Sequence, residues 1–138
     1  MTDKQVLQNM RKMVLATHWI KGSLKRVLEY VKDPNDPTGY CRLENGQFKQ
    51  GKVGHCLMGL VAVNTGHEVS GIEYELKQEE YKQASRITAR LYKNLPLNFR
   101  TKDHNTTYQA FCLESFNDYP ITQKEDIVAL IDRAIKNK

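Results

Sequence analysis

Apolar residues recur at helical spacing in separate stretches of this chain, and Gly or Pro residues stand between those stretches. Apolar side chains three or four positions apart share one face of a helix, so the pattern predicts helices that pack against one another. The expected helices cover residues 2–17, 23–31, 54–66, 72–95, 106–116 and 122–134. The stretch 72–95 is expected as one helix or as two broken near Gln78. We predict a mainly α-helical, single compact domain over residues 1–138, with five or six helices and a small β-hairpin near residues 40–50.

Polar residues at helix starts support several of these boundaries. A Ser or Thr followed three residues later by Glu or Gln forms a capping box, in which each side chain satisfies a backbone N–H of the first turn. This spacing occurs at 2–5, 70–73 and 122–125. Gly59 lies inside the expected third helix, where glycine costs about 1 kcal/mol relative to alanine. We therefore expect another element to pack closely against Gly59.

The segment between the second and third helices carries the turn signals. Residues 33–39 contain two prolines and must form a loop. Asn45-Gly46 lies between the short mixed segments 40–43 and 47–49, and both turn residues tolerate positive φ, which is typical of a hairpin. A two-stranded ribbon is weak alone, so we expect it to lie on the helices.

Composition excludes several classes of protein. The chain has 138 residues, with no stretch of about 18 apolar residues that could span a membrane and no apolar stretch behind a basic start. These features indicate a small cytoplasmic protein. The chain has three cysteines, which is an odd number, and they lie far apart in the sequence, so free thiols are expected. The four histidines are scattered and Cys-x-x-Cys is absent, so neither a metal nor another cofactor is expected.

The net charge of +5 is unevenly distributed. Residues 1–66 carry ten Lys/Arg against five Asp/Glu, whereas residues 67–138 carry eleven of each. A one-sided surplus favours an anionic partner more than an even distribution would. The surplus is nevertheless less dense than is usual in proteins that bind duplex nucleic acid.

Several short motifs resemble those of a family of small uncharacterised proteins from actinobacteria and phages, known only as a domain of unknown function. Trp19 and Gly22 match its Trp-x-x-Gly motif, the segment 56–59 matches its Cys-x-x-Gly motif, and 116–118 matches its (Trp/Phe)-Asn-Asp motif with Phe for Trp. Thr122, Glu125 and Val128 match the pattern that opens the family's last helix. The stretch 23–40 looks like an insertion. The resemblance implies an α-rich single domain and no known activity.

Cys56 is the candidate nucleophile. It lies near an expected helix N-terminus, where the positive end of the dipole favours a thiolate. His18, His55 or His104 could act as the base, with Asp118 or Asn117 orienting it. The alternative is that Cys56 is a small buried apolar residue opposite Gly59, which is the usual place of a free cysteine. His55 points to another face than Cys56 and would make a poor base.

Trp19 and Asn117-Asp118 also allow two interpretations. Asn-Asp before a helix could bind a ligand, but such pairs more often hydrogen-bond backbone groups and stabilise a turn. Trp19 is the only tryptophan and is expected to fill the core near Phe116, although it could also form the wall of a pocket.

Residues 21–55 form the candidate binding surface. Seven Lys/Arg occur in this segment with Tyr30, Tyr40 and Phe48 between them, as in surfaces that bind single strands or nucleotides. The Gly-rich turn at 51–54 could hold an anion, although it lacks the Gly-Lys-Ser/Thr of a P-loop. A solvated basic face with no ligand is the alternative. The binding residues predicted here and at the motifs are Trp19, Lys21, Lys25, Lys52, His55 and Asn117.

The leading hypothesis is a small intracellular, non-enzymatic binding protein of phage or bacterial origin. It engages an anionic ligand, which could be a nucleotide, a nucleic acid or an acidic protein surface. A cysteine-dependent enzyme that uses Cys56 with Asp118 is the first alternative. A structural or partner-binding adaptor is the second, and an exposed apolar patch would be its mark.

Overall fold

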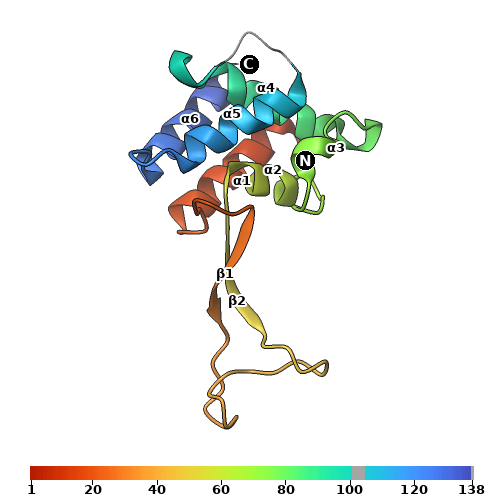
Figure 1. The fold of residues 1–138 in the computed structure, drawn as a ribbon, viewed down its shortest axis with the longest axis vertical. Coiled ribbons are helices and arrows are strands. Elements are labelled where there is room, and N and C mark those ends of the chain that lie inside the picture. Colours follow the sequence, from red (N-terminus) through yellow and green to blue (C-terminus); the bar gives the residue numbers. More distant parts are fainter. Residues whose placement is uncertain (101–104, 138) are drawn as a thin grey trace.

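The computed structural model describes residues 1–100 and 105–137, and it shows a helical body from which one long β arm extends (Figure 1). The body contains α1 (Asp3–Leu15), α2 (Leu57–Asn64), α3 (Ile72–Glu75), α4 (Lys82–Lys93), α5 (Thr106–Asp118) and α6 (Lys124–Lys136), with short 3₁₀ turns η1 (Glu79–Tyr81) and η2 (Leu97–Phe99). The arm contains β1 (Lys25–Tyr30) and β2 (Gln50–His55). The predicted class, a mainly α domain with a small hairpin, is confirmed.

Helix α2 is the centre of the body. Its residues 57–62 are all buried, because α1, α4 and α5 pack around it. A helix that is apolar on every side can be stable only when it is covered on every side. Helix α1 lies between this core and α6, and it buries Val6, Leu7, Met10 and Val14.

Five of the six predicted helical segments contain α-helix in the structure, although several details differ. Thr2 and Gln5 form the predicted capping box of α1, and the break predicted near Gln78 separates α3 from α4. No side chain caps α3, which begins instead after Gly71 in a left-handed conformation.

Helix α5 ends later than predicted, and α6 both begins and ends later. Helix α5 continues through Asn117 and Asp118, which were expected in a loop. At α6 the Asp126 carboxylate accepts the Gln123 N–H at 2.8 Å. The cap predicted at Thr122 is therefore wrong, and Thr122 is buried instead.

The helix predicted over residues 23–31 is also wrong, because this segment forms β1. The apolar spacing over these few residues fits a strand as well as a helix, and Val27 and Tyr30 favour a strand. Strand β1 pairs antiparallel with β2, with Lys25 opposite His55 and Val27 opposite Val53.

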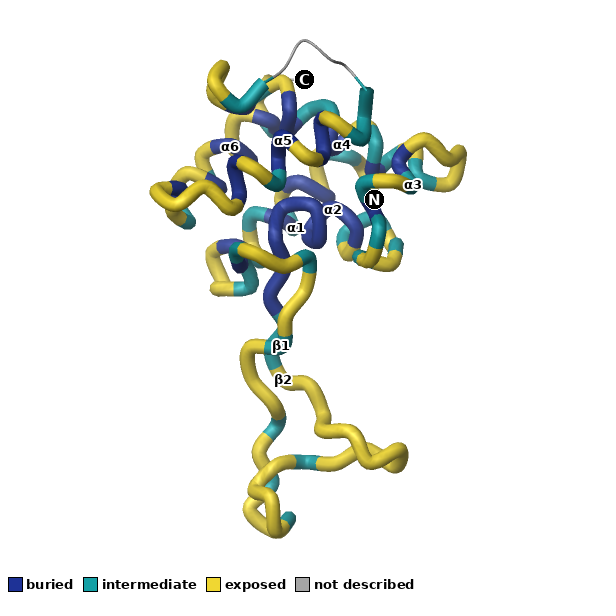
Figure 2. The backbone as a smooth tube through the Cα atoms, viewed as in Figure 1, coloured by how far each residue is buried: buried dark blue, intermediate teal, exposed yellow. Residues whose placement is uncertain are grey.

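The basic segment 21–55, which we call the arm, extends away from the helices, and most of it is exposed (Figures 1 and 2). The predicted turn is present near its far end, where Gly46 has a φ of 85° and the Leu43 N–H donates to Gln47 O at 2.7 Å. Arg42 and Phe48 form an isolated bridge beside this turn. The regular strands lie closer to the body than predicted, and the ribbon does not lie on the helices.

Gly59 shows the expected close approach. A Cβ at this position would lie 2.1 Å from the Leu24 carbonyl oxygen and 3.0 Å from His55 Cβ. The chain that enters the arm therefore crosses α2 at a point where only glycine fits.

We expect Gly59→Ala to lower the free energy of unfolding by about 2 kcal/mol, since overpacking outweighs the gain of about 1 kcal/mol in helix propensity. Urea denaturation would measure the change. Val63→Ala, at a residue of the same helix that is 41% exposed, is the matched control and should leave stability the same or higher. A stabilised Gly59→Ala protein would contradict the close packing.

Candidate functional site

The side-chain amide of Asn117 joins three distant segments of the chain. Its Oδ1 accepts the Trp19 Nε1–H at 2.6 Å and the Leu57 N–H at 3.0 Å. Its Nδ2 donates to the Ile20 carbonyl oxygen at 3.0 Å. Asn117 is fully buried, so these bonds satisfy polar groups that water does not reach. We call this arrangement the Asn117 clamp.

Asp118 and Lys21 extend the clamp to the surface. Asp118 Oδ1 accepts the Gly22 N–H at 2.8 Å and the Asn117 Nδ2–H at 2.9 Å. Lys21 Nζ donates to the Tyr119 carbonyl oxygen at 2.7 Å, just beyond the end of α5. A cation at the C-terminus of a helix interacts favourably with its dipole.

Both ends of the arm meet at the clamp. The His55 N–H donates to His18 O at 2.7 Å, and the Ile20 N–H donates to His55 O at 3.0 Å. Trp19 thereby forms a bridge with His55, directly before the helix that Leu57 begins. The three motifs that suggested the family therefore come together at the base of the arm.

This cluster is packed as core. Cys56 is 4% exposed, and Trp19 lies partly buried against the same hydrophobic cluster. Cys56 is therefore buried, and Asn117 and Trp19 make the kind of contacts that the structural interpretation of these two residues expected.

Cys56 is poorly suited to nucleophilic chemistry. Burial raises the pKa of its thiol to about 11, and the charges of Glu114 and Asp118 add to the effect. The thiol is thus protonated at neutral pH, whereas a nucleophile needs the thiolate.

The candidate bases also lie in unsuitable places. A ring nitrogen of His18 contacts the Val53 carbonyl oxygen at 2.8 Å. Burial lowers the pKa of His55. His104 lies outside the described residues.

A small acidic pocket lies next to the clamp and was not predicted. Its volume is about 180 Å³, and its lining includes Cys56, Glu73, Glu114 and Asp118. Burial, together with the neighbouring charges of Glu73 and Asp118, raises the pKa of Glu114 to about 7. No group of side chains among residues 1–100 and 105–137 could hold a metal ion.

The aromatic residues predicted to interleave the basic ones meet in the arm. The ring centroids of Tyr30, Tyr40 and Phe48 lie 5.7 to 6.4 Å apart. The Arg42 guanidinium lies 5.7 Å from the centre of the Phe48 ring, within the range of a cation–π interaction.

Some of the basic side chains predicted to bind an anion are exposed, whereas others are hydrogen-bonded within the chain. Lys25 and Arg26 are exposed on β1, and Lys49 is exposed just before β2. Lys52 instead donates to the Thr17 hydroxyl, and Lys21 is held at the clamp. The Gly-rich turn predicted before α2 is part of β2, so its N–H groups do not form a helix N-terminus.

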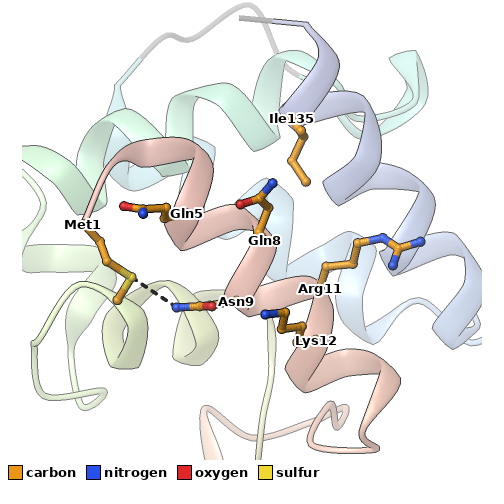
Figure 3. A pocket seen from close by; sticks show the side chains of 7 residues that line it. All are labelled: Met1, Gln5, Gln8, Asn9, Arg11, Lys12 and Ile135. Atoms are coloured by element: carbon orange, nitrogen blue, oxygen red, sulfur yellow. Dashed lines mark hydrogen bonds between the residues drawn. The ribbon is translucent and has the colours of Figure 1, made fainter.

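A larger hollow lies elsewhere, along the outer face of α1 (Figure 3). It has a volume of about 600 Å³ and is lined by polar side chains such as Gln8, Asn9 and Lys12, with Ile135 at one edge. None of the predicted site residues lies there.

The chain matches over residues 1–137 the model of a family described as "Family of unknown function (DUF6197)". The chain belongs to this family. No curated protein and no solved structure matched the chain at the significance required. In the part of the chain that is described, no helix is long and apolar enough to cross a membrane.

We expect Asn117→Ala to lower the free energy of unfolding by about 3 kcal/mol, since it leaves the Trp19 Nε1–H, the Leu57 N–H and the Ile20 carbonyl buried and unpaired. Urea denaturation followed by the fluorescence of Trp19, the only tryptophan, would measure the loss. Asn98→Ala, at an exposed residue, is the control. Equal stability of the two variants would refute the clamp.

The acidic pocket predicts a pH dependence. The pKa of Glu114 is raised from its ordinary 4.5 to about 7, so folding becomes less favourable as pH rises through this window and then levels off. Glu114→Gln should remove this decline. Thermal unfolding of both proteins from acidic to neutral pH would show a stability gap that widens toward neutral pH. Glu44→Gln, at an exposed residue of the arm, should leave the dependence unchanged.

Proposed function

We propose that this chain is a small, non-enzymatic binding protein of the cell interior, of phage or bacterial origin, and that its arm engages an anionic ligand. The observation that carries the proposal is the arm itself. It extends clear of the body (Figure 1), and it carries seven Lys/Arg against four Asp/Glu. Surface charge of one sign raises the local concentration of an oppositely charged partner and speeds its association.

The aromatic residues of the arm give such a partner apolar contact area. Tyr30, Tyr40 and Phe48 are 43%, 40% and 37% exposed. Together with Arg42 they combine the residue types that dominate binding energy in interfaces. The rings form one cluster on a projecting element, so a partner can contact all of them at once.

The cysteine-enzyme alternative has less support. A thiol with a raised pKa inside the core is the opposite of a reactive cysteine. The Oδ1 of Asp118, its proposed partner, already accepts hydrogen bonds from the Gly22 N–H and the Asn117 side-chain amide. The adaptor alternative is favoured by a specific observation, since five large apolar residues of the arm are exposed: Leu28, Tyr30, Tyr40, Leu43 and Phe48.

The test is binding of anionic probes to the full chain as salt is raised. The probes are a single-stranded oligonucleotide, a duplex and a polyglutamate peptide. We expect at least one of them to bind, and its affinity should fall as salt rises because screening and counterions compete with the Lys/Arg contacts.

The arm variant Lys25→Glu/Arg26→Glu/Lys49→Glu should weaken this binding by about tenfold or more, in line with the loss of several charge contacts. Lys21 and Lys52 are kept because they hold the body and the base of the arm. The matched control is Lys4→Glu/Lys93→Glu/Lys136→Glu, three exposed residues of the body. Equal losses of affinity in both variants would indicate non-specific attraction and refute the proposal. An arm variant that binds every probe with the affinity of the wild type would also refute it.

A further inference from the structure

Another pocket lies where the base of the arm meets the segment that follows α2. Its volume is about 310 Å³, at the lower end of the range for small-molecule sites. The arm, α2 and the segment after α2 contribute these lining residues: Lys25, His55, Val63, His67, Glu68 and Val69. Two of the predicted binding residues, Lys25 and His55, therefore line one cavity. We call it the arm-base pocket.

The strand register places Lys25 and His55 next to each other. They lie directly opposite one another in the pair of β1 and β2, and opposed residues of an antiparallel pair have their side chains on the same face of the ribbon. Lys25 is exposed, whereas His55 is only 6% exposed. The arm therefore supplies the pocket with a buried imidazole and a neighbouring ammonium group.

The segment after α2 adds a second imidazole and one carboxylate. The ring of His67 stacks on that of Tyr81, with the centroids 3.9 Å apart, so packing fixes its position. The last carbonyl groups of α2 already accept the N–H groups of residues 65–67 and need no basic side chain as a partner. In the described part of the chain, no ion pair involves Lys25 or Glu68. The charged groups of the pocket are therefore available to a ligand.

The electrostatic surroundings of His55 favour an anion. Burial lowers the pKa of His55, and the charges of Lys25 and His18 lower it too, although a hydrogen bond to the Leu24 backbone opposes the shift. An anion beside the two basic groups offsets these charges and favours the imidazolium. With His55 protonated, the two cations face Glu68 and the ligand. A single negative charge on the ligand then balances the charge of these groups.

We propose that the arm-base pocket binds a small organic carboxylate. The carboxylate group lies between Lys25 and His55, with His67 as a further donor. The aliphatic part of the ligand lies against Val63, which is 41% exposed, and against Val69, so it covers apolar surface. This inference rests on the proposed function, since Lys25 belongs to the arm, and it names the class of ligand that the base of the arm takes.

The lining of the pocket suits a small monoanion better than a polyanion. A phosphate backbone selects dense Lys/Arg, whereas the pocket has one Lys and an acidic residue, Glu68. The next basic residue of β1, Arg26, lies opposite Gly54. Successive residues of a strand point to opposite faces, so Arg26 is on the face away from the pocket.

The experiment is an NMR titration of the full chain with sodium butyrate, followed through the imidazole signals of the histidines. We expect the signals of His55 and His67 to shift and to saturate, with a dissociation constant of about 1 to 10 mM for a ligand of so few atoms. Acetate should bind more weakly than butyrate by about threefold or more, because it has less apolar surface to bury. Sodium chloride and butylammonium chloride are the controls for ionic strength and for a cation.

Two variants change the affinity in opposite directions. Lys25→Gln should weaken butyrate binding by about tenfold, because a charge-assisted hydrogen bond is lost. Glu68→Gln should strengthen it by about threefold, because a like charge is removed, and a folding defect cannot produce such a gain. Arg26→Gln is the matched control, at the neighbouring exposed residue of β1, and should bind like the wild type. Circular dichroism checks that every variant is folded.

The affinity should also depend on pH. Bound butyrate favours protonated His55, so binding should tighten as pH falls from neutral toward about 5.5, a range in which an aliphatic carboxylate stays ionised. The gain should level off below the lowered pKa of His55 in the free protein. An affinity that does not change with pH would contradict the contact with His55.

Other outcomes overturn the inference and separate it from the proposed function. Butyrate that shifts no histidine signal at about 100 mM overturns it. So do shifts that sodium chloride or butylammonium reproduces, or affinities that Lys25→Gln and Arg26→Gln lower equally. If an oligonucleotide or polyglutamate still binds in a salt-dependent way, the proposed function stands without this pocket. A chain that binds neither butyrate nor any polyanion refutes both.

Discussion

The side-chain amide of Asn117 is the contact on which the rest of this structure depends. Its oxygen accepts hydrogen bonds from the indole N–H of Trp19 and from the first backbone N–H of α2, and its nitrogen donates one to the Ile20 carbonyl oxygen. The three segments come from distant parts of the sequence. An amide can serve all of them because it has both an acceptor oxygen and donor hydrogens. Neither Asp nor a hydrophobic residue of similar size offers that combination.

The Asn117 clamp also helps to determine the orientation of α2. This helix begins at the clamp and is buried on all sides, so it has no polar face to determine its orientation. The hydrogen bond from Leu57 to Asn117 fixes its first turn, and Gly59 fixes its distance from the chain that enters the arm. A buried polar contact here supplies the directionality that apolar packing lacks.

The amphipathic helices could be predicted from the sequence, because their apolar stripes run over several turns. Strand β1 could not, since the apolar pattern of residues 23–31 is short and its partner strand lies beyond a long loop. Of the predicted site residues, Trp19, Asn117 and Asp118 do lie together, although their short motifs did not show that Asn117 is buried there. The pocket of Glu73 and Glu114 was missed because the two carboxyl groups meet only through tertiary packing of α3 against α5.

The two ends of the arm leave the body side by side, since Trp19 bridges His55 at the clamp. The segment between Trp19 and His55 is therefore a long loop whose two ends are joined at the surface of the body. Lengthening such a loop adds only slowly to the entropy cost of bringing its ends together. The arm can thus change in length at little cost to the stability of the helical body.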